Sequence, residues 1–168
     1  LNSVDHIRNG EADLMLAGAS DAAVLPSGMG GFCSVKAMSK RNDEPTKASR
    51  PWDKGRDGFV MGEGAGVLVM ESLAHAKKRG ARILAEYLGG GISTDAYDLT
   101  SPRADGRDVI LCMRSALADA GVEAGDVDLV NAHGTSTPVG DLCEVAAVNE
   151  VFGARDASTF KLNSTKSM

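Results

Sequence analysis

The residues most able to do chemistry lie in the stretch NAHGTSTPVGD, residues 131–141, which follows an apolar run. His133 stands at the expected C-terminal end of a buried strand, the position at which α/β proteins place their ligands. Gly134 and three hydroxyl residues follow, and these can present hydrogen-bond donors to a polar substrate. Asp141 and Glu144 open the next helix three residues apart on one face, with Asp141 also a suitable N-cap. The same residues would equally suit a turn whose hydroxyls bond the local backbone and whose histidine is only packed, so residue chemistry leaves both interpretations open.

Other motifs point to no nucleotide or metal site. Lys166 follows another strand-like stretch in the same way, although taken alone it is typical of an ordinary surface lysine. The glycine cluster at 62–66 precedes the β-like run VLVM rather than a helix, which favours close packing or a tight hairpin over phosphate binding. The histidines lack H-x-x-x-H spacing, and Cys33, Cys112 and Cys143 fit neither a disulfide framework nor a zinc site.

The elements that must position these residues alternate between strand and helix. We expect strands at 13–20, 81–90, 127–133 and 159–165, a strand, glycine turn and strand at 58–71, and helices at 1–7, 73–80, 109–120 and 142–152. Residues 25–50 should be mostly loops and short helical turns, one of them at 35–38. The first strand is apolar on both faces, which predicts burial in a parallel or mixed sheet. The last helix should bury the face formed by Leu142, Val145, Ala146, Asn149 and Phe152. This alternation predicts an α/β fold in which helices cover the sheets.

Composition excludes several classes of protein. The 168 residues are 43% hydrophobic and 24% charged, as in a folded domain and unlike a disordered or fibrous chain. No apolar run approaches the roughly 20 residues of a membrane-spanning helix. The net charge of -5 argues against a nucleic-acid partner, and three scattered cysteines favour a reducing compartment. The chain lacks a visible targeting peptide, begins within a predicted helix and ends just after a strand-like stretch, so we interpret it as part of a longer protein.

The motif NAHGTSTPVGD, followed later by NSTKSM, resembles the β-ketoacyl-acyl carrier protein synthases, the condensing enzymes of fatty-acid synthesis. The segments GMGGF, AMSKRND, ASRPWDKGRDGFVMGEGAGVLVMESLAHAKKRGA and STDAYDLTSP resemble the same family in the same order. The resemblance covers essentially the whole chain and is closest to the elongating synthases of bacteria and plastids. It implies an α/β thiolase-like fold, two similar halves layered α-β-α-β-α, usually in a homodimer. Residues 1–85 would form the C-terminal part of the first half, and residues 86–168 the N-terminal part of the second.

The resemblance implies a decarboxylative Claisen condensation. In the family a cysteine holds the acyl chain as a thioester, malonyl-acyl carrier protein loses carbon dioxide, and the resulting enolate attacks that thioester. His133 matches the first of two histidines that donate hydrogen bonds to the malonyl thioester carbonyl. Lys166 matches a lysine that organises the site, and Glu144 its buried charge partner. Thr135 and Thr137 match the threonines that bind the phosphopantetheine arm.

The resemblance also assigns the surroundings of the site. Phe32 matches a residue that lines the acyl pocket, and Lys36 a basic position that meets the acidic acyl carrier protein. Lys40 and Arg41 could extend a basic docking patch. The loop 95–102 matches one near the pocket mouth, with Thr100 and Ser101 as candidate substrate contacts. No metal or organic cofactor is implied, because the phosphopantetheine arrives on the carrier protein, and the expected compartment is the cytoplasm or the plastid stroma.

The chain departs from the family in what it lacks. No cysteine stands in the Ala-Cys-x-x-Gly context of the nucleophile, and the second histidine would lie just past Met168, so the chain alone is expected to be inactive. A polyketide-type ketosynthase remains an alternative, although modular polyketide synthases usually carry glycine in place of Ser136. A non-catalytic partner subunit resembling a chain-length factor is another, although His133 together with Lys166 favours the enzyme.

Overall fold

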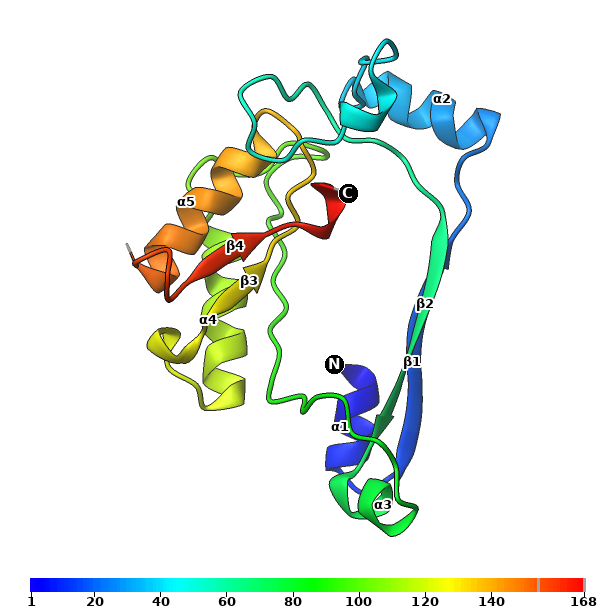
Figure 1. Ribbon diagram of the computed structural model, residues 1–168, viewed down its shortest axis with the longest axis vertical. Helices are drawn as coiled ribbons and strands as arrows, with labels where there is room; N and C mark the ends of the chain where they lie inside the picture. Colours follow the sequence, from blue (N-terminus) through cyan, green and yellow to red (C-terminus); the bar gives the residue numbers. More distant parts are fainter. Residues whose placement is uncertain (154, 168) are drawn as a thin grey trace. The chain divides into compact units, whose positions relative to one another are not determined.

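The computed structural model describes residues 1–153 and 155–167, which fall into two compact units. The first unit comprises residues 1–24 and 62–88, and the second comprises residues 25–61 and the chain from residue 89 onward (Figure 1). In the described residues each unit contains a two-stranded sheet, antiparallel in the first and parallel in the second.

The first unit is an antiparallel strand pair with a short helix next to it at each chain connection. Strand β1 (Leu14–Asp21) pairs with β2 (Gly64–Glu71) along its whole length. Helix α1 (Asn2–Arg8) precedes β1, and helix α3 (Leu73–Lys78) follows β2. Both helices lie where the sequence predicts them, and each is followed by a glycine with positive φ, as expected of helix ends.

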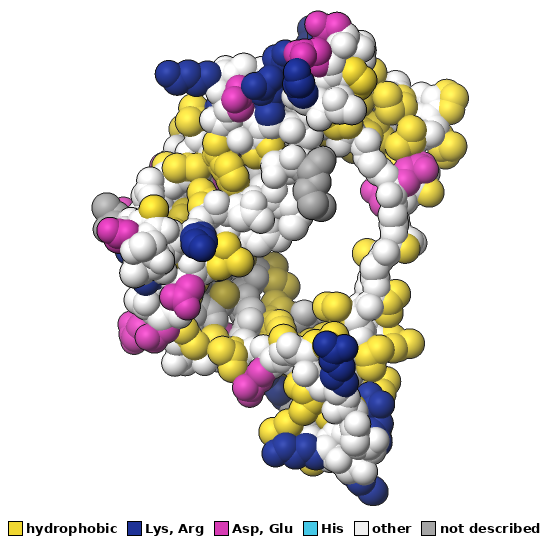
Figure 2. Space-filling model, viewed as in Figure 1, with side chains coloured by type: hydrophobic (Ala, Val, Ile, Leu, Met, Phe, Trp, Pro, Cys, Tyr) yellow, Lys and Arg dark blue, Asp and Glu magenta, His cyan; other side chains and the backbone are white. Residues whose placement is uncertain are grey.

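The predicted environment of β1 is wrong. The strand is antiparallel to β2 rather than part of a parallel or mixed sheet, and most of its residues are exposed. Figure 2 shows hydrophobic side chains exposed along this part of the chain, and Leu68 on β2 is 67% exposed. Helix α1 packs against both strands, yet most residues of the strand pair stay exposed.

The glycine cluster at 62–66 leads directly into β2, which confirms the reading against a phosphate-binding turn, since that needs a helix N-terminus. The turn is no tight hairpin, because the partner of β2 is β1, much earlier in the chain. The strand expected just before the cluster is reduced to one bridge between Phe59 and Met38.

The second unit carries the parallel strand pair and three longer helices. Strand β3 (Leu129–Asn131) pairs with β4 (Lys161–Asn163), and helix α4 (Arg107–Ala120) packs against α5 (Gly140–Phe152). Strands and helices from residue 107 onward lie where the sequence predicts them. The unit also has short 3-10 turns, η1 (Pro45–Lys47), η2 (Ala124–Asp126) and η3 (Thr165–Ser167).

The predicted buried face of α5 is wrong. Leu142 is 64% exposed, and Ala146 and Asn149 are exposed as well. The helix is rotated about its axis relative to the prediction, because a carboxylate near its start is buried in polar contacts. The small apolar residues that follow this carboxylate on the same side of the helix are therefore buried as well. The buried side chains are Asp141, Cys143, Ala147 and Val148.

Two further segments differ from the prediction. Helix α2 (Pro26–Val35) forms where loops were expected, with proline in its first turn and Lys36 in the left-handed conformation at its end. Its glycines conceal it in the sequence because glycine lowers helix propensity. The strand expected at 81–90 forms no ladder with any described residue. At its C-terminal end the Gly90 N–H donates instead to Asp119 Oδ2 on α4, at 2.9 Å.

Membrane insertion by a helix finds no support, since none of the helices in residues 1–153 and 155–167 is long and apolar enough to cross a bilayer.

Candidate active site at the ends of strands β3 and β4

The C-terminal ends of β3 and β4 bring His133 and Lys166 together. The strands run parallel with Asn131 opposite Asn163, so the segments that follow them leave the sheet at the same edge. The Ala132 N–H donates to Asn163 O at 2.7 Å and extends this alignment by one residue. Lys166 Nζ then donates to the backbone oxygen of His133 at 2.7 Å. Two residues that lie far apart in the sequence are therefore neighbours at the sheet edge where α/β folds bind ligands.

Glu144 holds the backbone from which the His133 side chain projects. Its Oε1 accepts from the His133 N–H at 2.6 Å, and its Oε2 accepts from the Gly134 N–H at 2.8 Å. The structure thus differs from the charge pair implied by the resemblance: among the described residues Glu144 forms no ion pair with Lys166, which is exposed. The carboxylate instead satisfies two consecutive backbone donors and fixes the exit of the chain from β3.

We expect the Glu144→Gln substitution to lower the free energy of unfolding by about 1–3 kcal/mol. In glutamine an NH2 group replaces one of the two carboxylate oxygens, and that group cannot accept from a backbone N–H. One hydrogen bond is therefore lost, and the other is weakened because it is no longer assisted by a charge. Denaturant unfolding of the full-length protein measures the effect. The matched control is Glu150→Gln on the same helix, where the carboxylate is exposed. Equal stability of the two variants would contradict a structural role for Glu144.

The turn after β3 depends on two left-handed residues. Gly134 has φ +43°, and an added Cβ would lie 2.6 Å from Ser164 Cβ and 3.2 Å from Trp52 Cζ2, so only glycine fits. Ser136 has φ +67° and is fully buried, and its Oγ accepts from the Arg50 N–H at 3.0 Å. The Ser136 hydroxyl is therefore committed to holding the turn and is not available to a substrate.

Thr135 and Thr137 place their hydroxyls together on this turn. The two Oγ1 atoms lie 3.1 Å apart and share a hydrogen bond, and both residues are half-buried. Gly140 makes room for them, because an added Cβ would lie 2.6 Å from Thr137 Oγ1. A hydroxyl pair of this kind can donate and accept at once, as an amide-containing arm requires.

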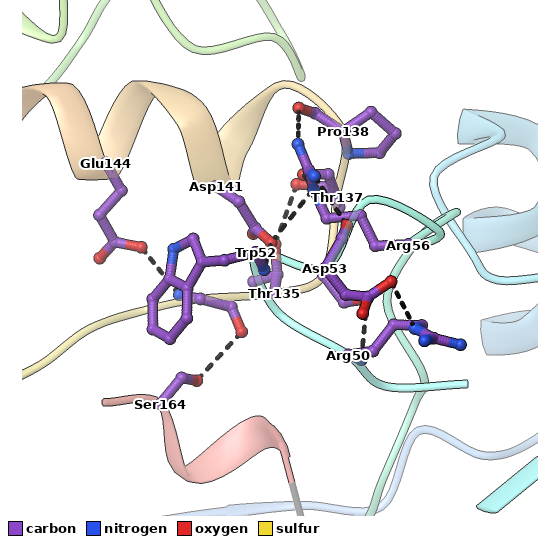
Figure 3. Close-up of polar contacts among 12 residues, drawn as sticks. Arg50, Trp52, Asp53, Arg56, Thr135, Thr137, Pro138, Asp141, Glu144 and Ser164 are labelled. Atoms are coloured by element: carbon purple, nitrogen blue, oxygen red, sulfur yellow. Dashed lines mark hydrogen bonds and ion pairs between the residues drawn. The ribbon is translucent and has the colours of Figure 1, made fainter. Parts of the chain in front are cut away.

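A loop of residues 49–58, SRPWDKGRDG, wraps this turn, and we call it the strap. Asp141, fully buried, accepts from the Trp52 N–H at 2.9 Å and lies 3.4 Å from Arg56 Nε (Figure 3). The expectation that Asp141 caps its helix is wrong: α5 begins at Gly140 after Val139, and the aspartate binds the strap instead. Sequence reasoning assigned the strap no role. The signal that could have identified the strap is its composition, which is rich in arginine and aspartate and includes a tryptophan. Such a composition suits a loop that makes buried hydrogen bonds.

The strap and the residue just after it contact helix α2 and the segment that follows it. The Phe32 and Phe59 rings meet edge to face with centroids 5.5 Å apart, so the predicted acyl-pocket residue packs on the chain just after the strap. Asp57 accepts from Ser39 Oγ at 2.6 Å and from the Lys40 N–H at 2.9 Å. These hydrogen bonds hold the pKa of Asp57 below its usual range.

The basic patch expected around Lys36 is interleaved with acidic side chains. Lys36 is exposed, as are Lys40 and other lysines of this stretch. Ion pairs nearby join Lys47 to Glu44 at 2.6 Å, Arg41 to Glu44 at 3.6 Å and Arg50 to Asp53 at 2.9 Å. Figure 2 shows Lys and Arg side chains mixed with Asp and Glu at the top of the view.

Thr100 and Ser101 lie in an exposed loop. Both backbone N–H groups donate to Asp98 Oδ1 at 2.9 Å, and these bonds lower the pKa of Asp98. In the described part of the chain no hydrogen bond joins this pair to the His133 turn, so their substrate contact stays a prediction.

The three cysteines lack the surroundings of a nucleophile. Cys33 is exposed, whereas Cys112 Sγ donates to Gly91 O and Cys143 Sγ to Arg103 O, each at 3.1 Å. Burial raises the pKa of the Cys143 thiol, which disfavours its thiolate. Within residues 1–153 and 155–167 no group of three or more His, Cys, Asp or Glu side chains could hold a metal ion.

In the native full-length protein we expect iodoacetamide near neutral pH to modify Cys33 and to spare Cys143. Alkylation needs an accessible thiolate, and Cys143 is both buried and poorly ionised. Peptide mass spectrometry reads the two sites, and the denatured protein serves as the control in which both react. Rapid labelling of Cys143 in the native state would show that α5 opens readily.

Two family models match nearly the whole chain. Residues 2–76 match the beta-ketoacyl synthase N-terminal domain, and residues 84–168 match the beta-ketoacyl synthase C-terminal domain. The chain therefore belongs to the beta-ketoacyl synthase family, and the α/β ketosynthase fold, which is thiolase-like, is confirmed.

Comparison with individual relatives shows which members of the family the chain is similar to. The chain is 58% identical to 3-oxoacyl-[acyl-carrier-protein] synthase I, chloroplastic, of Arabidopsis thaliana, over 99% of this chain and 35% of the relative. It is 51% identical to 3-oxoacyl-[acyl-carrier-protein] synthase 2 of Vibrio cholerae, over 100% of this chain and 42% of the relative. Among solved structures, a type II polyketide acyl carrier protein in complex with its ketosynthase matches with a TM-score of 0.92 and 40% identity, over 99% of this chain and 41% of that one. The chain thus spans well under half the length of these relatives.

Proposed function

We propose that the chain is part of a 3-oxoacyl-[acyl-carrier-protein] synthase, which elongates an acyl chain by decarboxylative condensation. The observation that carries the proposal is the shared end of β3 and β4, where Lys166 Nζ lies 2.7 Å from the backbone oxygen of His133. The identities of 58% and 51% to synthases of that name support it.

The proposed reaction joins an acyl thioester on an enzyme cysteine to malonyl-acyl carrier protein. The bond between the malonyl methylene and its carboxylate breaks, carbon dioxide leaves, and the electron pair forms a thioester enolate. The enolate carbon attacks the acyl carbonyl, a carbon–carbon bond forms, and the carbon–sulfur bond to the cysteine breaks. The cysteine leaves as a thiolate and takes up one proton, and the carrier protein keeps the 3-oxoacyl product. The nucleophilic cysteine and the second histidine would come from the longer protein.

His133 is proposed to donate a hydrogen bond from its neutral imidazole to the malonyl thioester oxygen, where negative charge develops. Its side chain is exposed while Glu144 holds its backbone, so the ring is free to face a substrate from a fixed origin. Lys166 adds a positive charge beside it. Thr135 and Thr137 are proposed to bind the phosphopantetheine arm, and their paired hydroxyls suit that task.

The surroundings complete the proposal. Phe32 would line the acyl pocket, Lys36 would contact the acyl carrier protein, and Thr100 with Ser101 would contact substrate at the mouth. Phosphopantetheine enters with the carrier protein as part of the substrate, and no metal or organic cofactor takes part. The assembled enzyme is proposed to be a homodimer, as the resemblance implies. Its proposed compartment is the cytoplasm or the plastid stroma, since the named relatives are bacterial or chloroplastic.

The test is condensation by the full-length protein, supplied with acyl- and malonyl-acyl carrier protein. Release of carbon dioxide together with a product two carbons longer is expected. A well-folded full-length protein that releases neither would contradict the proposal and would favour a partner subunit resembling a chain-length factor.

A polyketide-type ketosynthase is the second candidate, because the solved structures similar to this chain include a type II polyketide ketosynthase at 40% identity. The same assay separates the two candidates. A fatty-acid synthase makes one condensation per round and waits for the oxo group to be reduced, whereas a polyketide enzyme extends the unreduced product again.

A further inference from the structure

We propose that Arg56 of the strap is a positioning residue for the condensation, acting through the backbone of the His133 turn; the inference rests on the proposed function. The Arg56 guanidinium donates from Nε to Thr137 O at 3.1 Å and from Nη2 to Pro138 O at 2.6 Å. Nη1 donates to Asp53 O at 2.9 Å and closes the strap on itself. The side chain is only 10% exposed, and its bond to Thr137 O is partly buried.

The same guanidinium balances the buried charge of Asp141. That carboxylate is fully buried, and its Oδ2 lies 3.4 Å from Arg56 Nε and 2.9 Å from the Trp52 N–H, while its Oδ1 has no hydrogen-bond partner among the described residues. A buried carboxylate that loses the cation beside it must reorient or take up a proton. Removal of the Arg56 guanidinium therefore disturbs the start of α5 as well as the turn.

Both ends of the disturbed segment bear on the chemistry. Thr137 lies at one end, with its hydroxyl bonded to Thr135 in the proposed arm-binding pair. Glu144 lies one turn into α5 and holds the His133 N–H at 2.6 Å. Ser136, just before Thr137, keeps a left-handed conformation that only surrounding bonds can maintain. Arg56 thus fixes the position of His133 and of the threonine hydroxyls without touching the substrate.

A planar guanidinium suits this role because one side chain reaches three carbonyl oxygens and a carboxylate. Lysine can keep the charge beside Asp141 but cannot make the fork of bonds to Thr137 and Pro138. The conservative variant Arg56→Lys is therefore expected to retain part of the function, and Arg56→Gln to retain little of it.

The experiment compares full-length protein carrying Arg56→Gln, Arg56→Lys or the control Arg114→Gln, whose arginine forms an exposed ion pair on α4. Three quantities are measured: kcat for malonyl decarboxylation, the rate at which iodoacetamide alkylates the nucleophilic cysteine, and the melting temperature. We expect Arg56→Gln to lower kcat about 10–100-fold while alkylation stays near the parental rate, because small displacements of positioned groups cost rates of this order. Arg56→Lys should fall between that variant and the parent, and Arg114→Gln should match the parent.

Each outcome decides the inference. A selective loss of decarboxylation in Arg56→Gln, partly restored in Arg56→Lys, supports it. Parental kcat in both variants overturns it, and so does a parallel fall of kcat, alkylation and melting temperature, which marks a merely structural arginine. If Arg56→Gln does not fold, the same comparison is made with Arg56→Lys. A parent that alkylates normally but neither decarboxylates nor condenses overturns the proposed function itself, and the inference with it.

Discussion

A His133→Ala variant of the full-length protein is expected to condense acyl and malonyl thioesters about 10²–10³-fold more slowly than the parent, the cost of removing one donor from a developing oxyanion. Glu144 and Lys166 hold the backbone of His133, so the loss of the imidazole ring removes a hydrogen-bond donor without unfolding the turn. The effect is measured as the rates of carbon dioxide release and of product formation, in assays stopped at fixed times. Decarboxylation should fall with condensation, because both pass through the enolate.

His6→Ala is the matched control, since His6 is an exposed histidine of α1 that bonds Glu11 at 2.5 Å. It should retain the parental rate. Full activity of the His133→Ala variant would assign the chemistry to another histidine. Loss of activity accompanied by a lower melting temperature would place His133 in the structure rather than in the reaction.

The Gly58→Ala substitution is expected to destabilise the protein by more than about 2 kcal/mol, because it combines backbone strain with a clash. Gly58 has φ +148°, and an added Cβ would lie 2.5 Å from Met38 C and 2.6 Å from Ser39 N. These are backbone atoms that cannot rotate away. The Gly58 N–H also donates to Ser136 O at 3.0 Å, so any shift is transmitted to the His133 turn.

Thermal unfolding of the full-length protein measures this prediction, with Gly62→Ala as the control. An added Cβ at Gly62 meets nothing within 4 Å, so that variant should melt with the parent. Activity of Gly58→Ala at low temperature should fall as well. Equal melting of the two variants would show that the chain around Met38 can move aside at little cost.

Local patterns sufficed for the elements with clear periodicity or clear stops. Helix α4 follows from its spacing of apolar residues and ends at Gly121, whose φ is +64°. Strands β3 and β4 follow from short apolar runs, and with them the placement of His133 and Lys166 after strand ends. Such signals lie within a few residues of the feature that they predict.

The features that failed depend on partners distant in sequence. The buried face of α5 is set by the bond from Trp52 to Asp141, 89 positions apart, and no helical periodicity contains that bond. Glu144 has the side-chain type of a charge partner for a lysine, yet nearby backbone donors take its oxygens first. Helix α2 is formed by residues of low helix propensity, and none of its residues is buried, so neither propensity nor an apolar face marks it in the sequence.

The strap touches two regions with different tasks. On one side Asp57 binds Ser39 and Lys40, beside the proposed carrier-docking residue, and Arg41 Nη2 donates to Gly55 O at 2.8 Å. On the other side Arg56 binds the turn after His133. A chimera that exchanges docking segments between family members would therefore also replace residues that hold the His133 turn. Residues 36–59 and 133–144 should be transplanted together if a hybrid is to recognise a new carrier and retain activity.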